Sequence, residues 1–261
     1  MELRLNRRKV IAALVAAGGA GVTGAALAYR HRYDVWAGLR MNKNGLKEFL
    51  QECDRIHERH RAQTAEMVKA LKRKYQDPVF GRVRVWDLVE RMQRVHDTSD
   101  PGLMGMSQFG HVTQVLTAME SNGVQNSHFF LLALLHDAGK TIVLAGEAPE
   151  NVFCPVRRLG EYPEKCGLDQ VVYQFGHAEF IYSRIKDHVP PEVAWAARYH
   201  TVNLADATPF MTETERGTTE SLLRPFRRFD GGFKSPYRQP KINLDKYRDL
   251  IEQTFPTPIL V

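Results

Sequence analysis

The chain has 261 residues, of which 43% are hydrophobic and 25% are charged, a composition that is ordinary for a globular protein and excludes a disordered or fibrous one. Its formal net charge is +6, but residues 1–30 hold five Lys or Arg against one acid, which leaves only +2 for the other 231 residues. Because those residues show no basic stripe with interleaved aromatic side chains, we expect no nucleic-acid partner.

The N-terminal segment "NRRKVIAALVAAGGAGVTGAALAYR" predicts export or membrane attachment. Two arginines precede 20 uncharged residues, 10–29, and "ALA" at 26–28 fits a small-residue cleavage site. The segment resembles a twin-arginine export leader, and its length could also span a bilayer. We therefore predict a signal or anchor helix at residues 1–30 and a periplasmic or exported protein. The alternatives are a membrane tether through residues 10–29 and, if the leader is not functional, a cytoplasmic protein.

The remainder of the chain predicts helices joined by irregular loops. Apolar residues recur at helical spacing among charged ones over residues 45–75, and His57 and His60, one turn apart among Arg and Glu, are expected on a solvated face. Further helices are predicted at 85–95, 108–120, 127–144, 168–187, 190–202, 213–229 and 243–254. The segments 146–167 and 229–240 contain several prolines or glycines and predict long loops. Clear alternating strands are absent, so the expected fold class is all-α, with one catalytic domain at 40–261.

The chain has three cysteines, Cys53, Cys154 and Cys166, which are too few for a disulfide scaffold and lack the CxxC spacing of a zinc site. Cys154 and Cys166 could pair in an oxidising compartment. Free thiols are the alternative.

The stretch "LLHDAGK" (134–140) places a histidine and an aspartate directly after the apolar run "FFLLALL". Adjacent helical residues point about 100° apart, so His136 and Asp137 can both face one cavity between helices. Burying them requires partners, and a metal ion would satisfy both, because divalent and trivalent metals accept imidazole nitrogen together with carboxylate oxygen. A carboxylate also has two oxygens with which to bridge two ions.

Four more residues lie in or beside apolar helical stretches at separations of about one helix plus a connection. Antiparallel helices with such spacings can bring their ligands to the same level of a bundle. Taken singly, each of the three histidines could be an ordinary buried histidine, and the aspartate could be a turn residue before "GG". Together with the His-Asp pair they suffice for two metal ions. The predicted ligands are His111, His136, Asp137, His177, His200 and Asp230.

The pattern H…HD…D is that of the HD-domain superfamily, which consists mostly of metal-dependent phosphohydrolases. Within that superfamily the chain resembles the myo-inositol oxygenase family, whose motifs occur here in the family's order over nearly all of residues 40–261. The stretches that carry the resemblance include "QTAEMVKALKRKY" (63–75), "DTSDPG" (97–102), "LLHDAGK" (134–140), "CGLDQVVYQFGHAEFIY" (166–182), "ARYHT" (197–201), "FRRFDGGFKSP" (226–236) and "YRDLIEQTFP" (247–256).

The resemblance implies an HD-domain helical bundle with two iron ions in the mixed-valent Fe(II)/Fe(III) state and O2 as co-substrate. His111, His136 and Asp230 would hold one iron, His177 and His200 would complete the site of the second, and Asp137 would bridge them. The implied reaction opens the ring of myo-inositol, or of a related cyclic polyol, to a uronic acid such as D-glucuronate. Imidazole and carboxylate suit iron and manganese alike, so the residues alone leave the metal open.

The resemblance also implies residues that act on the substrate. Lys140 would be catalytic, because an ammonium near a bound alkoxide stabilises developing negative charge; the alternative for Lys140 is an ordinary ion pair with an acid. The implied substrate-binding residues are Arg40, Asp97, Ser99, Lys140, Thr201 and Lys234. The connection from Asp137 to His177 is shorter than in animal inositol oxygenases, which leaves the identity of the polyol open.

Two alternative functions remain at this stage. An HD-type metal-dependent phosphohydrolase would use two metals to activate water against a phosphate ester. A non-catalytic, membrane-tethered helical binding protein would keep the fold without the metals. For the oxygenase we expect a small-molecule polyol as the only partner and a monomeric chain.

Overall fold

The computed structural model describes residues 43–103, 106–235 and 242–261. The chain divides into a unit of residues Met1–Leu50 and a compact unit of residues Gln51–Val261. Of the first unit only residues 43–50, the beginning of helix α3, are described. The predicted leader, the tether at 10–29 and Arg40 therefore lie outside the described residues.

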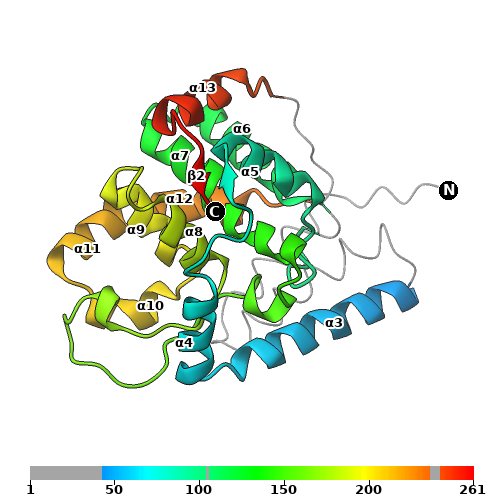
Figure 1. The fold of residues 1–261 in the computed structure, drawn as a ribbon, viewed down its shortest axis with the longest axis vertical. Coiled ribbons are helices and arrows are strands. Elements are labelled where there is room, and N and C mark those ends of the chain that lie inside the picture. The colour runs from blue at the N-terminus through cyan, green and yellow to red at the C-terminus, as the bar shows by residue number, and fades with distance from the viewer. Residues whose placement is uncertain (1–42, 104–105, 236–241) are drawn as a thin grey trace, which may run out of the picture. The chain divides into compact units, whose positions relative to one another are not determined.

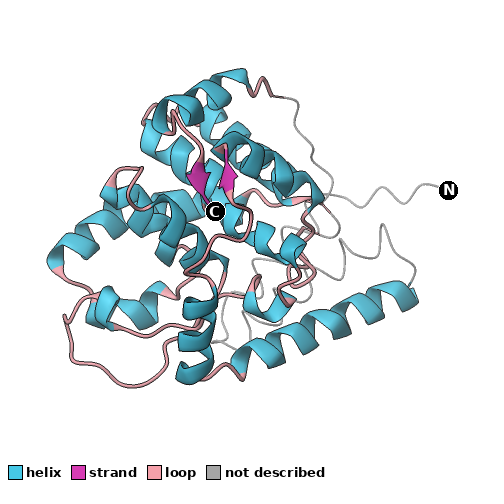
Figure 2. Ribbon diagram, in the orientation of Figure 1, coloured by secondary structure: helices cyan, strands magenta, loops and turns pink. Residues whose placement is uncertain are grey.

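The described part of the chain is mainly helical, which confirms the expected all-α class (Figures 1 and 2). The α-helices are α3 (Lys43–Arg61), α4 (Ala65–Lys74), α5 (Val85–Arg91), α6 (Gln108–Ser121), α7 (Ser127–Leu135), α8 (His177–Ile185), α9 (Pro191–Tyr199), α10 (Leu204–Ala207), α11 (Glu213–Thr218), α12 (Arg224–Gly232) and α13 (Asp245–Thr254). The strands found in these residues are β1 (Arg82–Val83) and β2 (Ile259–Leu260), which pair antiparallel.

Shorter helical turns continue or connect these helices. The 3₁₀ segments are η1 (Met92–Arg94), η2 (Ala138–Ala145), η3 (Pro149–Asn151), η4 (Leu168–Gln170) and η5 (Thr208–Phe210), and η6 (Thr219–Leu223) is a π-helical segment. Between α11 and α12 the π-helical turns of η6 precede Pro225, which has no N–H to donate to the preceding turn.

Several helices begin at residues whose side chains cap the first turn. The Ser107 hydroxyl accepts a hydrogen bond from the Gly110 N–H at the start of α6, and the Asn126 side chain accepts one from the His128 N–H at the start of α7. Thr212 and Glu215 form a capping box at the start of α11. These caps place helix starts within a few residues of the positions that the sequence predicts.

The core of the Gln51–Val261 unit forms around α7, whose sequence "SHFFLLALL" is apolar on nearly every side. Residues 131–135 of this helix are all buried. Helix α7 packs against α6, α9 and α12, and α8 packs against α9 and η2. The end of α7 is therefore surrounded by helices on several sides, which is the position that the predicted metal ligands require.

One helical stretch in the described residues, Ser127–Ala145, is long and apolar enough to cross a membrane by length and composition. However, 67% of its apolar window is buried inside the protein. It comprises α7 and η2, and we interpret it as the central helix of the core.

Two predictions about local structure are wrong. The predicted helix at 168–187 begins only at His177, because residues before it pair with another segment: Arg158 and Tyr173 form an isolated antiparallel bridge, and the Gln174 N–H donates to the Arg157 carbonyl. His60 is not solvated, since it is only 2% exposed and its Nδ1 donates to the Glu150 carbonyl oxygen at 2.6 Å.

All three cysteines are free in the structure, so the pair Cys154–Cys166 is not formed. Cys53 and Cys154 are buried, and the Cys53 thiol donates to the Thr98 carbonyl oxygen at 3.0 Å. The alternative of free thiols is the one that the structure shows.

Candidate metal centre

The His136–Asp137 pair lies where α7 ends and the chain changes to the 3₁₀ segment η2. His136 keeps helical backbone angles, whereas Asp137 has φ −98° and ψ −2° and starts the tighter helix. His136 is fully buried and Asp137 is 2% exposed. The apolar helix thus delivers two polar side chains into the protein interior.

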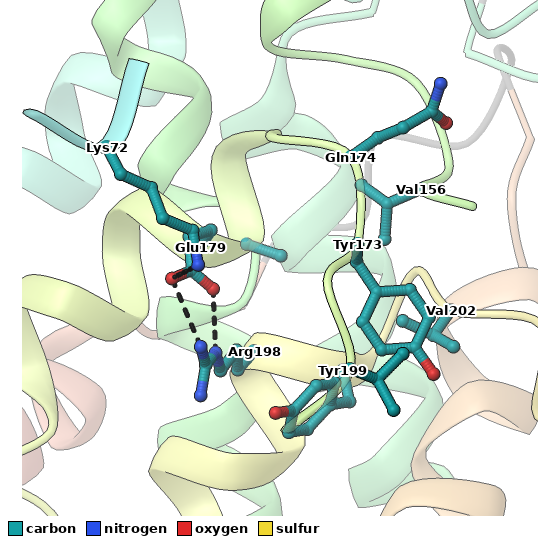
Figure 3. Close-up of a pocket in the computed structure, with 10 residues that line it drawn as sticks. Lys72, Val156, Tyr173, Gln174, Glu179, Arg198, Tyr199 and Val202 are labelled. Atoms are coloured by element: carbon teal, nitrogen blue, oxygen red, sulfur yellow. Dashed lines mark hydrogen bonds and ion pairs between the residues drawn. The ribbon is translucent and has the colours of Figure 1, made fainter. Parts of the chain in front are cut away.

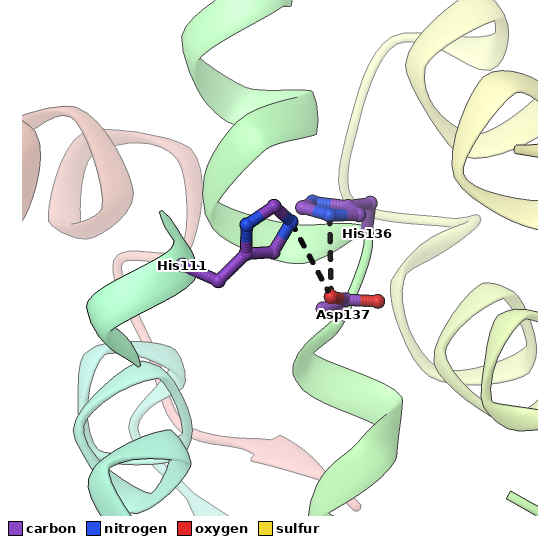
Figure 4. A group of neighbouring side chains, drawn as sticks. All are labelled: His111, His136 and Asp137. Atoms are coloured by element: carbon purple, nitrogen blue, oxygen red, sulfur yellow. Dashed lines mark ion pairs between the residues drawn. The ribbon is translucent and has the colours of Figure 1, made fainter. Parts of the chain in front are cut away.

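Two histidines from two elements face one oxygen of Asp137, and a second aspartate contacts both histidines. His111 Nε2 from α6 lies 4.0 Å from Asp137 Oδ2, and His136 Nε2 lies 3.4 Å from the same oxygen. Figure 4 shows both imidazoles pointing at this carboxylate. Asp230 Oδ1 from α12 lies 2.8 Å from His111 Nε2 and 3.6 Å from His136 Nε2. We refer to His111, His136 and Asp230 as the first ligand group.

The other oxygen of Asp137 faces a second pair of histidines. Its Oδ1 lies 3.1 Å from His177 Nε2, at the start of α8, and 3.6 Å from His200 Nε2, at the end of α9. The two Nε2 atoms lie 3.2 Å apart. We refer to His177 and His200 as the second ligand group. The structure therefore brings all six predicted ligands together, with the two oxygens of Asp137 facing one group each.

Backbone carbonyls orient three of the four histidines. Nδ1 of His136 donates to the Ala133 oxygen at 2.9 Å, and Nδ1 of His200 donates to the Ala197 oxygen at 2.7 Å. Nδ1 of His177 likewise donates to the Val152 carbonyl. A carbonyl oxygen can only accept, so these rings carry a proton on Nδ1 and present Nε2 to the centre. This arrangement is typical of histidines that bind metals through Nε2.

The polar atoms at the centre fit a cation better than they fit one another. His177 and His200 direct two Nε2 atoms and a carboxylate oxygen at one point, and in neutral imidazoles with Nδ1 protonated these are all acceptors. His136 Nε2 and His111 Nδ1 are buried without a hydrogen-bond partner among the residues that the structure describes. The ligand atoms of His111, His136 and Asp137 lie within 4.8 Å of one another, and so do those of Asp137, His177 and His200. Imidazole and carboxylate ligands at this spacing suit two borderline metal ions.

Burial and neighbouring charges shift the pKa values of the candidate ligands in different directions. Although burial lowers the pKa of His136, the carboxylates of Asp137 and Asp230 raise it to about 10. Burial, together with the nearby positive charge of His136, lowers the pKa of His200 to about 4, and burial also lowers the pKa of His111. Burial would raise the pKa of Asp137, but Lys140 and His136 hold it well below its usual range. In the protein without metal, His136 is therefore the ligand with a strongly raised pKa.

We expect metal uptake to release about one proton from His136 at pH 7 to 9. A metal ion must displace the Nε2 proton, so the apparent metal affinity should rise with pH until the pH approaches the His136 pKa of about 10. Potentiometric titration of metal-free protein with ferrous iron under argon, in weakly buffered solution, measures the released proton directly. Uptake without proton release, and an affinity independent of pH over this range, would contradict the assignment of His136.

The Lys140 ammonium lies beside this centre and is buried, with 4% of the residue exposed. Its Nζ donates to Asp97 Oδ2 at 2.9 Å, to Asp137 Oδ2 at 3.1 Å and to Gln108 Oε1 at 3.1 Å. Burial lowers the pKa of Lys140, but Asp137 and Asp97 outweigh burial and raise it above its usual value. Lys140 is thus a permanent cation that connects the bridging carboxylate to the loop at residue 97.

The other predicted substrate residues lie on separate elements around the centre. Asp97 Oδ1 accepts hydrogen bonds from the Ser99 N–H and from the Ser99 hydroxyl, at 2.9 and 2.8 Å. Lys234 Nζ pairs with Asp100 Oδ2 at 2.9 Å, and the Thr201 hydroxyl is buried without a partner. Burial lowers the pKa of Lys234, but the carboxylates of Asp100, Asp230 and Asp137 outweigh burial and raise it well above its usual value.

Two residues that the sequence analysis did not single out also belong to this region. Gln108 is fully buried at the start of α6, and its Oε1 accepts a hydrogen bond from Lys140 Nζ. Asp100 pairs with Lys234. A glutamine at a helix start has no distinctive pattern. Asp100, by contrast, lies inside the motif "DTSDPG", and this motif is the sequence signal that points to it.

The glycine of "LLHDAGK" has a steric role. A Cβ at Gly139 would overlap the backbone carbonyl oxygen of His177 and lie 2.9 Å from its carbonyl carbon. η2 and the start of α8 can therefore pack closely only because residue 139 has no side chain. This contact holds the second ligand group against the first.

We expect Gly139→Ala to lower the free energy of unfolding by about 3 kcal/mol, because overpacking at backbone contact forces a helix to shift. The same shift should weaken metal binding at the second ligand group, so the variant should retain less metal than the parent. Gly217→Ala is the matched control, since Gly217 lies exposed in α11 with no atom within 4 Å of an added Cβ. Chemical denaturation and elemental analysis of both variants check this; equal stability and metal content would contradict it.

Comparison with known proteins is consistent with this geometry. The family model described as myo-inositol oxygenase matches residues 51–154 and 151–261. A rice protein (Oryza sativa subsp. japonica) named probable inositol oxygenase is 26% identical over 255 residues, which cover 82% of this chain and 81% of that protein. Inositol oxygenase 1 of Arabidopsis thaliana is 23% identical over 259 residues, covering 83% and 80%. The human inositol oxygenase is 26% identical over 175 residues, covering 54% of this chain and 61% of that protein.

Proposed function

The chain belongs to the myo-inositol oxygenase family, and we propose that it is a non-haem di-iron oxygenase that opens the ring of myo-inositol, or of a closely related cyclic polyol, to a uronic acid. In this reaction one molecule of myo-inositol and one of O2 give one molecule of D-glucuronate and one of water. The oxidation removes four electrons from the polyol, which the reduction of O2 accepts.

One observation supports this function most strongly. The two oxygens of Asp137 face two different ligand groups, with His136 Nε2 3.4 Å from Oδ2 and His177 Nε2 3.1 Å from Oδ1. A carboxylate placed in this way can bridge two metal ions. Bound there, a pair of irons would supply the electrons for activating O2 and the positive charge that favours ionisation of a substrate hydroxyl.

The residues of the chain would bind and orient the polyol beside that centre. Lys140 holds a proton at Nζ next to Asp137, so it can stabilise negative charge as it develops on a substrate oxygen. Asp97, fixed by Ser99, can accept a hydrogen bond from a substrate hydroxyl. Lys234 can donate a hydrogen bond to another hydroxyl from the α12 side. The Lys234 ammonium also helps to hold the pKa of Asp230 well below its usual value. Such paired groups discriminate between polyols, because a missing hydroxyl leaves a buried partner unsatisfied.

Oxygen uptake tests the proposed function. Iron-loaded protein should consume O2 when myo-inositol is added, with one uronate formed per O2, and should form no product under argon. A panel of other cyclic polyols under the same conditions identifies the preferred substrate. Release of phosphate from nucleotides or sugar phosphates under argon, without O2 uptake on any polyol, would instead support an HD-type phosphohydrolase.

Metal content tests the cofactor separately from activity. We propose two irons per chain, and elemental analysis of protein isolated under argon should find about two metal ions, with iron rather than manganese restoring O2 uptake to the metal-free protein. A chain that folds and retains no metal would be the helical binding protein considered above.

A further inference from the structure

A pocket lined by none of the six candidate ligands lies within the Gln51–Val261 unit. Its volume is about 820 Å³, and its walls come from the end of α3, from the loop around residue 157 and from the segment that follows His200. Cationic side chains dominate its lining, with four arginines against one acid, Asp206: these arginines are Arg61, Arg157, Arg158 and Arg227.

Three of these four arginines form no ion pair with a carboxylate among the described residues. Arg61 and Arg157 are exposed and form no ion pair with any carboxylate that the structure describes. Arg227 is partly buried and donates to the Val202 carbonyl oxygen at 2.9 Å, and the Asp230 carboxylate interacts with it electrostatically without forming an ion pair. Arg158 forms an ion pair with Glu161, whose side chain is 91% exposed. A cleft lined by positive charge with little counter-charge concentrates anions from solution.

A smaller pocket on the other side of a shared wall shows the contrast (Figure 3). There, Glu179 accepts from Arg198 at 2.7 Å and pairs with Lys72 at 2.8 Å, so both cations are neutralised by the protein itself. Tyr173 lines both pockets, together with two valines. The excess of arginine over carboxylate in the large pocket is therefore a local property and not a general feature of this surface.

Buried polar atoms in the same lining also lack hydrogen-bond partners within the described part of the chain. These atoms are His60 Nε2, Tyr173 Oη and Thr201 Oγ1. His60 is 2% exposed, and the positive charges of His57 and Arg157 add to burial in lowering its pKa. Two hydroxyls can donate to an anion directly, and an imidazole becomes a second donor when it takes up a proton.

The pocket is connected to the metal centre through three elements. Thr201 follows the ligand His200 directly, and Arg227 precedes the ligand Asp230 by three residues on α12. His57 contacts the Ser99 carbonyl oxygen at 3.2 Å through Nε2, next to the hydrogen bond from Ser99 to Asp97. A group bound in the pocket would therefore lie beside the residues proposed to hold the polyol.

We propose that this pocket is a binding site for a phosphate group, supplied either by free phosphate or by a phosphorylated cyclic polyol. Several guanidinium groups without counter-ions favour a doubly charged tetrahedral anion over a singly charged carboxylate, and arginine is well suited to phosphate recognition. The phosphorylated-polyol source rests on the proposed function, whereas phosphate binding does not.

Calorimetric titration of the iron-loaded protein with inorganic phosphate tests the site. We expect saturable binding that the double variant Arg61→Gln/Arg157→Gln weakens by about tenfold or more, since charge-assisted hydrogen bonds are lost. The matched control is Arg55→Gln/Arg224→Gln, which removes two exposed arginines that pair with Glu52 and Glu220. Thermal melting of both double variants confirms that each is folded.

Phosphate that binds only at the metal centre would be insensitive to Arg61 and Arg157. Absence of saturable binding, or equal affinity in the parent and both double variants, would therefore overturn the proposal. The same titration with myo-inositol 1-phosphate distinguishes the sources: tighter binding than inorganic phosphate identifies the phosphorylated polyol, and equal binding identifies free phosphate. Because these titrations measure binding, their failure is separate from a failure of O2 uptake on myo-inositol.

Discussion

Asp137→Asn is expected to lose at least one of the two metal ions and to lower kcat/KM for O2-dependent polyol cleavage by about 100-fold or more. Substitution of a residue that only hydrogen-bonds to a metal ligand already lowers metal affinity or activity by about 10- to 100-fold. Asp137 itself faces both ligand groups. An amide has the same shape but has one oxygen and no charge, so it cannot offer carboxylate oxygens to both groups. One of them would face the NH₂ of the amide instead.

The measurement combines elemental analysis with O2 uptake on the same preparations. Asp87→Asn is the matched control, because Asp87 is an exposed aspartate on α5 away from the six ligands. The control should keep the metal content and activity of the parent. If Asp137→Asn also kept two ions per chain and full activity, the bridging role of Asp137 would be wrong.

Lys140→Met is expected to lower kcat by about 100-fold and the free energy of unfolding by about 3 to 5 kcal/mol. We expect the loss of activity because an ammonium that stabilises developing negative charge, or holds a proton for transfer, raises kcat by about 100-fold or more. The stability loss follows because Asp97 and Asp137 would remain buried without the cation that lies 2.9 and 3.1 Å from them. Methionine has a similar volume, so the change removes charge with little change in packing.

Steady-state kinetics and chemical denaturation of the iron-loaded variant separate these effects. Lys69→Met, on the exposed face of α4, is the control and should change neither quantity. A variant with lowered stability but unchanged kcat would show that Lys140 serves only as the structural partner of Asp97 and Asp137, the alternative considered from the sequence.

Helix patterns and motif spacing predicted most of what positions the site. The all-α class, the separate helices α6, α7 and α9, and the burial of the His136–Asp137 pair follow from apolar periodicity, because one face or the whole circumference of each helix must be covered. The convergence of the six ligands was predicted from their types and separations together with the family resemblance, and the geometry agrees with it.

Failures of prediction arise where distant segments decide the local structure. The mainly apolar residues 171–175 fit a helix by composition, but pairing with residues 157–159 holds them extended until Gly176. His60 sits among charged neighbours in sequence, yet the loop at Glu150 covers it. Neither contact has a local signature, since each joins residues far apart in the chain. The same holds for Gln108, whose role depends on where Lys140 points.

The central claim is that Asp137 bridges two metal ions, and anomalous X-ray diffraction at the iron edge from crystals of the iron-loaded protein tests it most directly. We predict two iron peaks per chain, one between Asp137, His111, His136 and Asp230 and one between Asp137, His177 and His200. A single peak, or two peaks of which only one contacts the Asp137 carboxylate, would contradict it.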